Sequence, residues 1–571
     1  MPSNLLIYIN KLVLSTALFF VFSFLFVYAA AAAPPVVPTD SGRELQDIKA
    51  RPQPGLNNPE PAPIQAPSAT TDSAKSANQD LRIKVSQFVF TGNSVLTNEQ
   101  LQATVTEFAG RELNFGELQQ VTERIEALYH QAGYFLTQVV LPPQQIRAGT
   151  VNINIIEGSL GQVRLEGESR ISPDTLYRLL DKLPKGKAVT EAMLDRQALL
   201  INDLAGGTAS MDLQAGDAPG TTDVVLIQNP ARLFTGRVGL DNHGLPATGE
   251  YRLGLYAALN SPLHLGDRLS GNVVTSNTGK LQTYGLRYDL PMGGDGWSVH
   301  LAKTRAVYAL GGAFSSLDAS GTADSWQAGV NYPWLRSRNA NIFTELQVDS
   351  NRLTDNLGAL SLNLKKRSYA LSFTPYADWR DKWLGGGANQ ASIELRTGKL
   401  NLGSDAKLLD LPPTGANTDG SFSKLILNVE RQQYLAKNIS LTGRWKQQFA
   451  STNLDSSEKV TIGGAQIMLA YPVGQASADE AGVGKLALNW QADKNLYFSL
   501  FAEYAQLELL HNPIAGTTGN NANLRDAGLA MSWRVLNGLD FSSSIAWAGR
   551  DKPNANDNDS PRIWANLGYN W

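Results

Sequence analysis

The residues that could carry out chemistry are few in this chain and stand far apart. The 571 residues include no cysteine, which excludes disulfides, thiolate metal sites and a cysteine nucleophile. No nucleotide-binding G-x-x-x-x-G-K-[ST] motif is present, and no Ser, His and Asp stand at a spacing typical of a hydrolase triad. The five histidines also lack the spacing of metal ligands: His130, His243, His264, His300 and His511. We therefore expect no enzyme activity, no metal and no cofactor.

The overall composition indicates a sheet-rich protein that does not bind nucleic acid. Lys and Arg total 49 against 52 Asp and Glu, whereas a nucleic-acid binder is usually basic. The chain has 51 glycines, with 11 Trp, 18 Tyr and 19 Phe, at a mean hydropathy of -0.20. Many glycines and aromatics at negative mean hydropathy are typical of sheets rather than of a helical membrane bundle.

The N-terminal segment, residues 1–32, is predicted to be a signal peptide. Lys11 precedes an uncharged run over residues 12–28, and residues 29–33 are all alanine, which suits cleavage. An uncleaved membrane anchor is the alternative, although the apolar run is near the lower length limit for a span. In either case the chain is expected to leave the cytoplasm.

Two short segments follow. Residues 33–51 are predicted to contain a short helix, because Ser41 and Glu44 have the spacing of a capping box. Pro52 ends it. Residues 52–81 are rich in Pro, Ala, Ser and Asn with almost no large apolar residues, which predicts a linker.

Residues 82–159 and 160–230 are predicted to be two copies of one small α+β unit. In both copies a strand is followed by two helices and two further strands, so the chain repeats with a period of about 75 residues. In the first copy, residues 115–131 form a helix with an apolar face, and residues 135–141 form a strand.

Residues 231–571 are predicted to form a transmembrane β-barrel. Short runs such as residues 282–290 alternate apolar and polar side chains, and glycine-rich or polar stretches separate them. A soluble sandwich also alternates, but the alternation continues over too many residues for one sandwich, and charged residues such as Lys485 occupy the polar face. At about 21 residues per strand and loop, the segment accommodates about 16 strands. The last strand carries Tyr569 and Trp571, which we expect to serve membrane assembly.

These segments together resemble the outer-membrane transporters of two-partner secretion, the haemolysin secretion/activation proteins of the ShlB/FhaC/HecB family. The resemblance implies α+β periplasmic POTRA repeats followed by an all-β transmembrane barrel of about 16 antiparallel strands. It covers essentially the whole mature chain. It rests on residues 90–94, 133–146 and 156–158 in the first repeat and on residues 241–244, 260–267, 288–291, 308–312 and 332–337 in the barrel.

The most diagnostic segment resembles the tip of the family's sixth extracellular loop, which folds back into the barrel lumen. Where the family pattern reads Val-Arg-Gly/Ala-Tyr, this chain has Met468, Leu469, Ala470 and Tyr471. The family's arginine pairs with an aspartate on a facing strand. Leu469 stands at the arginine position.

The facing strand departs from the family pattern as well. Ala505 stands at the aspartate position, with Glu503 on the same face. Replacing both members of a buried ion pair by apolar groups can be neutral, so we expect the loop to dock through apolar contacts of Met468, Leu469 and Tyr471. A loose loop with reduced activity is the alternative.

The resemblance implies a transport function in the outer membrane of a Gram-negative bacterium, with the POTRA domains in the periplasm. The expected partners are a large unfolded exoprotein of the adhesin or cytolysin type, outer-membrane lipids and the barrel-assembly machinery. Client contacts are predicted at Tyr134, Phe135 and Gln144, where an extended chain could add to a strand edge. The family's pore plug corresponds to the helix near Ser41, which is brief here. A barrel-assembly insertase of the same superfamily and a passive porin are the alternatives.

Overall fold

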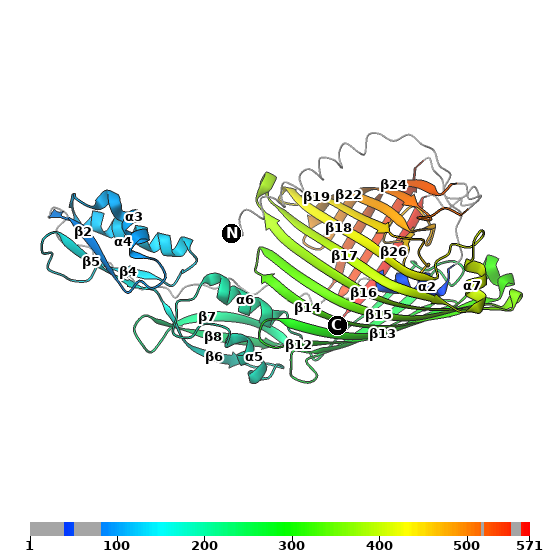
Figure 1. Cartoon of the computed structure of the whole chain (residues 1–571), viewed down its shortest axis with the longest axis horizontal. Helices are drawn as coiled ribbons and strands as arrows, with labels where there is room; N and C mark the ends of the chain where they lie inside the picture. Colours follow the sequence, from blue (N-terminus) through cyan, green and yellow to red (C-terminus); the bar gives the residue numbers. More distant parts are fainter. Residues whose placement is uncertain (1–38, 51–81, 515–518, 550–560) are drawn as a thin grey trace.

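The computed structural model describes residues 39–50, 82–514, 519–549 and 561–571. The predicted signal peptide and linker lie outside the described residues. From the N-terminus, the described chain forms a short helix, two α+β units and a closed barrel (Figure 1). Within these ranges no helix has both the length and the apolar character needed to cross a membrane.

The first α+β unit packs two helices on a small mixed sheet. Helix α4 begins after Asn114, which forms a reciprocal capping box with Glu117, and its buried positions Leu118, Val121 and Ile125 form the core of the unit. The sheet order is β2-β5-β4. The elements are β1 (Ile83–Lys84), β2 (Gln87–Thr91), α3 (Asn98–Val105), η1 (Thr106–Phe108), β3 (Glu112–Leu113), α4 (Phe115–Gln131), β4 (Gln138–Val140) and β5 (Thr150–Ile156).

The second unit repeats the order of one strand, two helices and two strands, without counterparts of β1, η1 and β3 among residues 159–230. Its three-stranded sheet has the order β6-β8-β7, so a parallel pair and an antiparallel pair share the central strand, as in the first unit. The elements are β6 (Ser159–Gly167), α5 (Pro173–Leu180), α6 (Glu191–Asn202), β7 (Gly207–Ala215) and β8 (Thr221–Pro230).

The predicted strand 135–141 is too long, because only β4, at its end, pairs with β5. The preceding residues Phe135 and Leu136 instead pack against the core of the second unit. Leu136 is buried there, and an added side chain at Gly158 would collide with it. Burial of these apolar side chains at the junction takes precedence over strand pairing.

Sixteen antiparallel strands close into the barrel, which confirms the expected strand number, and β26 pairs with β9 to complete it. Outward-facing side chains such as Leu286, Trp326 and Leu529 are exposed, which gives the lipid-facing band of a membrane barrel. The strands are β9 (Phe234–Asp241), β10 (Arg252–Asn260), β11 (Arg268–Ser276), β12 (Leu281–Met292), β13 (Trp297–Ala309), β14 (Ala319–Arg336), β15 (Ala340–Leu357), β16 (Leu362–Asp381), β17 (Gly387–Leu402), β18 (Gly420–Ala436), β19 (Ile439–Ala450), β22 (Glu480–Asp493), β23 (Leu496–Glu508), β24 (Asn521–Leu536), β25 (Leu539–Ala548) and β26 (Arg562–Asn570).

The connections at the end of the barrel away from the α+β units carry most of the remaining short elements. The sixth of them, residues 451–479 between β19 and β22, is called the sixth loop below. It contains the antiparallel pair β20 (Val460–Ile462) and β21 (Ala476–Ala478). Other turns and connections hold η2 (Gly312–Leu317), η3 (Gly358–Leu360), η4 (Trp383–Gly385) and α7 (Ser404–Asp410).

The second α+β unit is fastened to the short turns at the opposite end of the barrel (Figure 1). Arg336, at the end of β14, donates two hydrogen bonds to Asp203 at 2.8 and 2.9 Å. In the turn between β10 and β11, His264 accepts a hydrogen bond at its carbonyl from Ser172 at 2.8 Å. Both turns lie in motifs that carry the family resemblance, so these motifs serve the junction between the repeats and the barrel.

Candidate functional site

The short helix α2 (Ser41–Ala50) lies inside the barrel, against β13, β14 and β15. Leu45 is 1% exposed and packs on Ala306, Ala323 and Leu353 of the barrel wall. At the other face of the helix, Asp47 lies 3.5 Å from Arg252 of β10. The helix therefore spans part of the lumen and occupies space that a passing chain would need.

The start of α2 differs from the predicted capping box. Asp40, one residue earlier, accepts the Arg43 N–H at 2.9 Å and so caps the helix. Ser41 instead directs its N–H and its hydroxyl to the two carboxylate oxygens of Asp355 on β15, both at 2.8 Å. Tyr308 donates to the same carboxylate at 2.7 Å. Ser41 thus fixes the helix to the barrel wall, a role that its spacing from Glu44 did not reveal.

Helix α2 also contacts the sixth loop. Arg43 donates a hydrogen bond to the carbonyl of Gly474 at 3.0 Å. Gly42 lies so close to Ser456 and Ser457 that an added Cβ would collide with both. The helix is therefore held between the barrel wall and the loop.

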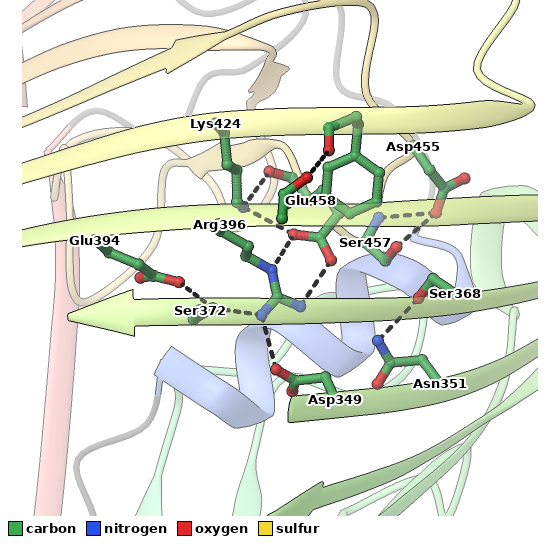
Figure 2. Close-up of polar contacts among 12 residues, drawn as sticks. Asp349, Asn351, Ser368, Ser372, Glu394, Arg396, Lys424, Asp455, Ser457 and Glu458 are labelled. Carbon is green, nitrogen blue, oxygen red and sulfur yellow. Dashed lines mark hydrogen bonds and ion pairs between the residues drawn. The ribbon is translucent and has the colours of Figure 1, made fainter. Parts of the chain in front are cut away.

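The base of the sixth loop, residues 453–459, is held to the barrel wall by ion pairs, and Figure 2 shows those of Glu458 with Arg396 and Lys424. Arg396 of β17 reaches Glu458 at 2.9 and 3.0 Å and Asp349 of β15 at 2.7 Å. Lys366 of β16 pairs with Asp455 at 2.7 Å. All these side chains are largely buried, so their charges are stable there only because each is paired.

The tip of the sixth loop, residues 467–471, is also buried in the lumen. Met468 and Tyr471 are fully covered, and both join an apolar cluster with the inner wall of β22, β23 and β24. The Tyr471 hydroxyl donates to the carbonyl of Arg525 at 3.0 Å. Trp564 of β26 donates from Nε1 to the carbonyl of Leu469 at 2.7 Å. The tip is therefore docked.

Purely apolar docking is wrong, because two carboxylates also hold the tip. The N–H of Leu469 donates to Glu503 of β23 at 2.9 Å, and the N–H of Ala470 donates to Asp526 of β24 at 2.9 Å. Ala505, which was aligned with the family's aspartate, is buried in the apolar cluster. The acidic partners are therefore present but displaced: one by two residues along β23, the other onto the next strand.

The sequence reasoning missed Asp526 and Trp564 as contacts of the tip. Both lie on inward-facing positions of strands that follow the loop, and each is at most 5% exposed. An isolated acidic residue among the apolar inward positions of β24 was the available signal for Asp526. No sequence signal placed Trp564 beside the loop.

The predicted client-contact residues lie in different environments. Tyr134 packs edge-on against Tyr129 beside the core of the first unit, while Phe135 packs on the second unit. The side chain of Gln144 pairs with the backbone of Asn152, donating at 2.7 Å and accepting at 2.8 Å. The Gln144 side chain thus occupies hydrogen-bonding positions on β5 next to those that β4 uses. The structure does not bring the three side chains together on one surface.

Two of the family motifs in the first unit meet at Glu157. Its carboxylate accepts hydrogen bonds from the N–H groups of Ser94 and Val95 at 2.7 and 2.8 Å and from the Tyr129 hydroxyl at 2.8 Å. Burial acts to raise the pKa of Glu157, but these hydrogen bonds outweigh it and hold the pKa below its ordinary value. The motifs therefore stabilise the unit itself.

The C-terminal residues close the barrel. The N–H of Trp571 donates to the carbonyl of Gly236 in β9 at 3.1 Å, and Tyr569 pairs with Val238 across the same seam. Both aromatic side chains are exposed on the outer surface. Their predicted role in membrane assembly stays a prediction.

A barrel with an internal helix, an inward-folded loop and two α+β units at one end defines an outer-membrane transporter of the POTRA type. In the part of the chain that the structure describes, no three His, Asp or Glu side chains gather as metal ligands.

Comparisons with known proteins agree with this class. Residues 83–158 match the model of the ShlB-type POTRA domain, and residues 220–508 match that of the haemolysin secretion/activation protein ShlB/FhaC/HecB. The heme/hemopexin transporter protein HuxB of Haemophilus influenzae is 25% identical over 503 residues, covering 86% of this chain and 87% of that protein.

Two solved structures share the fold. CdiB from Escherichia coli superimposes with a TM-score of 0.68 at 18% identity, covering 89% of this chain and 94% of that one. BamA from Haemophilus ducreyi, lacking POTRA domains 1–3, gives 0.50 at 15% identity, with 86% of this chain and 100% of that one covered.

The chain belongs to the haemolysin secretion/activation protein ShlB/FhaC/HecB family. It is a two-partner secretion transporter of the outer membrane, with its POTRA units in the periplasm and a secreted exoprotein as its cargo.

Proposed function

We propose that this transporter holds its lumen closed with α2 and the docked sixth loop, and that cargo passes when α2 leaves its site. The cargo is a large exoprotein of the adhesin or cytolysin type, received unfolded by the POTRA units and folded outside the cell. The process is transport without covalent chemistry. Outer-membrane lipids and, during biogenesis, the barrel-assembly machinery are its other partners.

One observation carries this proposal: α2 is bound inside the lumen by noncovalent contacts, polar ones at Ser41, Arg43 and Asp47 and an apolar one at Leu45. Ser41 bonds to Asp355, Arg43 to Gly474, and Leu45 fills an apolar site on the wall. Hydrogen bonds that involve a charged group contribute about 1.5–3 kcal/mol each. All contacts of this ten-residue helix with the wall and the loop are noncovalent, so its binding is reversible. Separating the hydrogen-bonded strands of the closed barrel would break many more contacts than displacing α2, so loss of α2 is the easier way to open the lumen.

The client would bind the POTRA sheets by strand addition. In both units each outer strand of the three-stranded sheet has one edge that pairs with no other described strand. In the first unit the exposed apolar side chains Val89 and Val140 lie on the two outer strands, β2 and β4. Tyr134, Phe135 and Gln144 stay candidates for this contact. Substituting Val89 with Lys on the edge strand β2 tests the surface without touching the buried core.

The decisive experiment deletes the gene and follows a large exoprotein whose own gene lies beside it. We expect this protein to disappear from the culture supernatant and the cell surface, and to return when the chain is restored. Unchanged secretion in the deletion strain would refute the transport proposal. If many outer-membrane proteins fall together instead, the chain acts as an assembly insertase.

The porin alternative makes a different electrical prediction. Because α2 and the sixth loop occupy the lumen, the full chain is expected to show low conductance in planar bilayers. A variant lacking residues 39–50 should show larger steady currents. A high, steady conductance of the full chain would favour a passive porin.

A further inference from the structure

A row of three charged side chains crosses the inner wall beneath the tip of the sixth loop. In the strand register Lys485 of β22 stands directly opposite Glu503 of β23, and Glu503 stands directly opposite Asp526 of β24. The two carboxylates are 3% and 4% exposed. The Lys485 ammonium lies 3.3 Å from Glu503 Oε1. The row therefore joins one cation to two acids at the place where the tip docks.

Glu503 connects Lys485 to the loop. Its Oε1 faces the ammonium, while its Oε2 accepts the N–H of Leu469 at 2.9 Å. The next N–H, that of Ala470, goes to Asp526. Met468, with φ of 55°, gives the tight turn that points these two successive donors at neighbouring strands. The loop thus binds the two carboxylates through its main chain.

Two acids directly opposite each other on neighbouring strands repel one another, and the repulsion grows when both are buried. Main-chain N–H groups carry only partial positive charge. Asp526 Oδ1 receives no hydrogen bond from a further N–H or hydroxyl group among the described residues. A positive charge beside the row relieves this repulsion, and Lys485 is the cation that the structure places in contact with it.

The ammonium of Lys485 is itself held in place. It lies 4.2 Å from the centre of the Phe501 ring, an inward-facing neighbour of Glu503 on β23. Its side chain also borders a cavity of about 620 Å³ that Glu503 and Ile467 line. Glu503 and the Phe501 ring therefore hold the cation at the row, while its side chain, 25% exposed, borders the cavity.

We propose that Lys485 is the positioning residue of the sixth loop: its charge holds Glu503 and Asp526 in the arrangement that receives the two N–H groups of the tip. This inference rests on the proposed role of the docked loop in transport, but the docking itself is measured separately. Leu469 is free to be apolar because the required charge comes from the barrel wall.

The test uses the absence of cysteine from the chain. Ala470, which is 2% exposed, is replaced by Cys in the full-length protein, and intact cells are labelled with a membrane-impermeant maleimide. We expect Lys485→Met to raise the labelling rate at least about tenfold, since truncating a partner of a buried charge pair has effects of this size. Heat-modifiable migration confirms that each variant barrel is folded.

Two further variants separate charge from other effects. Lys485→Arg keeps the cation and should label as slowly as the parent. Lys446→Met removes another lysine lining the same cavity, one that forms no ion pair within the described part of the chain, and should also label slowly. Unchanged labelling in Lys485→Met, equally fast labelling in Lys485→Arg, or the same increase in Lys446→Met would each overturn the proposal. Since labelling does not need cargo, it remains informative even if the transport proposal fails.

Discussion

The base and the tip of the sixth loop are fixed to the same barrel by different means. At the base, side-chain charges of the loop meet side-chain charges of the wall: Asp455 with Lys366, and Glu458 with Arg396. At the tip, the loop contributes main-chain N–H groups, and only the wall contributes charged side chains. Attachment of the base to the wall therefore depends on which side chains the loop carries, whereas attachment of the tip depends on the backbone conformation of its turn.

This difference explains how the tip diverged from the family pattern without losing its place. A main-chain donor survives substitution of its own side chain, so Leu469 can stand where the family has arginine. Substitution of a buried charged residue leaves its partner uncompensated. We therefore expect substitutions at the base to have larger effects than substitutions at the tip, unless the latter introduce charge or disturb the turn.

The largest effect is expected for Arg396→Leu at the base. It leaves Asp349 without its cation and Glu458 with Lys424 alone, and breaking a buried pair costs about 3–5 kcal/mol. The midpoint temperature of thermal unfolding, measured on the purified barrel in detergent, should fall clearly. Arg396→Lys, which keeps a single charge but loses the forked geometry, should shift it less. An equal stability of Arg396→Leu and the parent would remove the distinction between base and tip.

Leu469→Asp should disrupt docking of the tip by charge repulsion. It places a third carboxylate beside Glu503 and Asp526, so docking weakens by about 3 kcal/mol and secretion falls. Leu469→Met, of similar volume, serves as the control and should secrete normally. Quantifying the exoprotein in the supernatant checks both. Normal secretion by Leu469→Asp would show that docking of the tip is dispensable.

Gly42→Val tests whether the base also holds α2. The added side chain would collide with Ser456 and Ser457, and such overpacking costs about 1–3 kcal/mol. We expect α2 to leave the lumen more often and bilayer conductance to rise. Gln46→Ala, which removes only a weak hydrogen bond with Thr461 at 3.3 Å, is the matched change in the same helix and should leave conductance near the parent value.

The smallest effect is expected for Trp564→Phe at the tip. It removes one hydrogen bond to the Leu469 carbonyl and keeps most of the apolar contact, a loss of about 1 kcal/mol. Maleimide labelling of the introduced thiol in the Ala470→Cys background should rise only a few-fold. If Trp564→Phe weakened docking of the tip as much as is expected for Leu469→Asp, Trp564 rather than the two carboxylates would dominate docking.

Much of the fold was determined by the sequence alone, because it is written in local patterns. Period-two alternation predicted the barrel and its sixteen strands, the repeated order of helices and strands predicted two like units, and the apolar face of residues 115–131 predicted the first core. Residues 468–471, which resemble the tip of the family's inward loop, lie buried against the inner wall of the barrel.

Only the tertiary structure decided which side chains meet. Glu503, Asp526 and Lys485 become neighbours through the register of three strands, and a shift of one residue would turn each to the opposite face. Ser41 binds Asp355, more than 300 positions away in the chain, instead of capping its own helix. Phe135 joins the core of the second unit rather than a strand. Local propensities cannot encode such contacts, because closure of the barrel and packing between units bring these residues together.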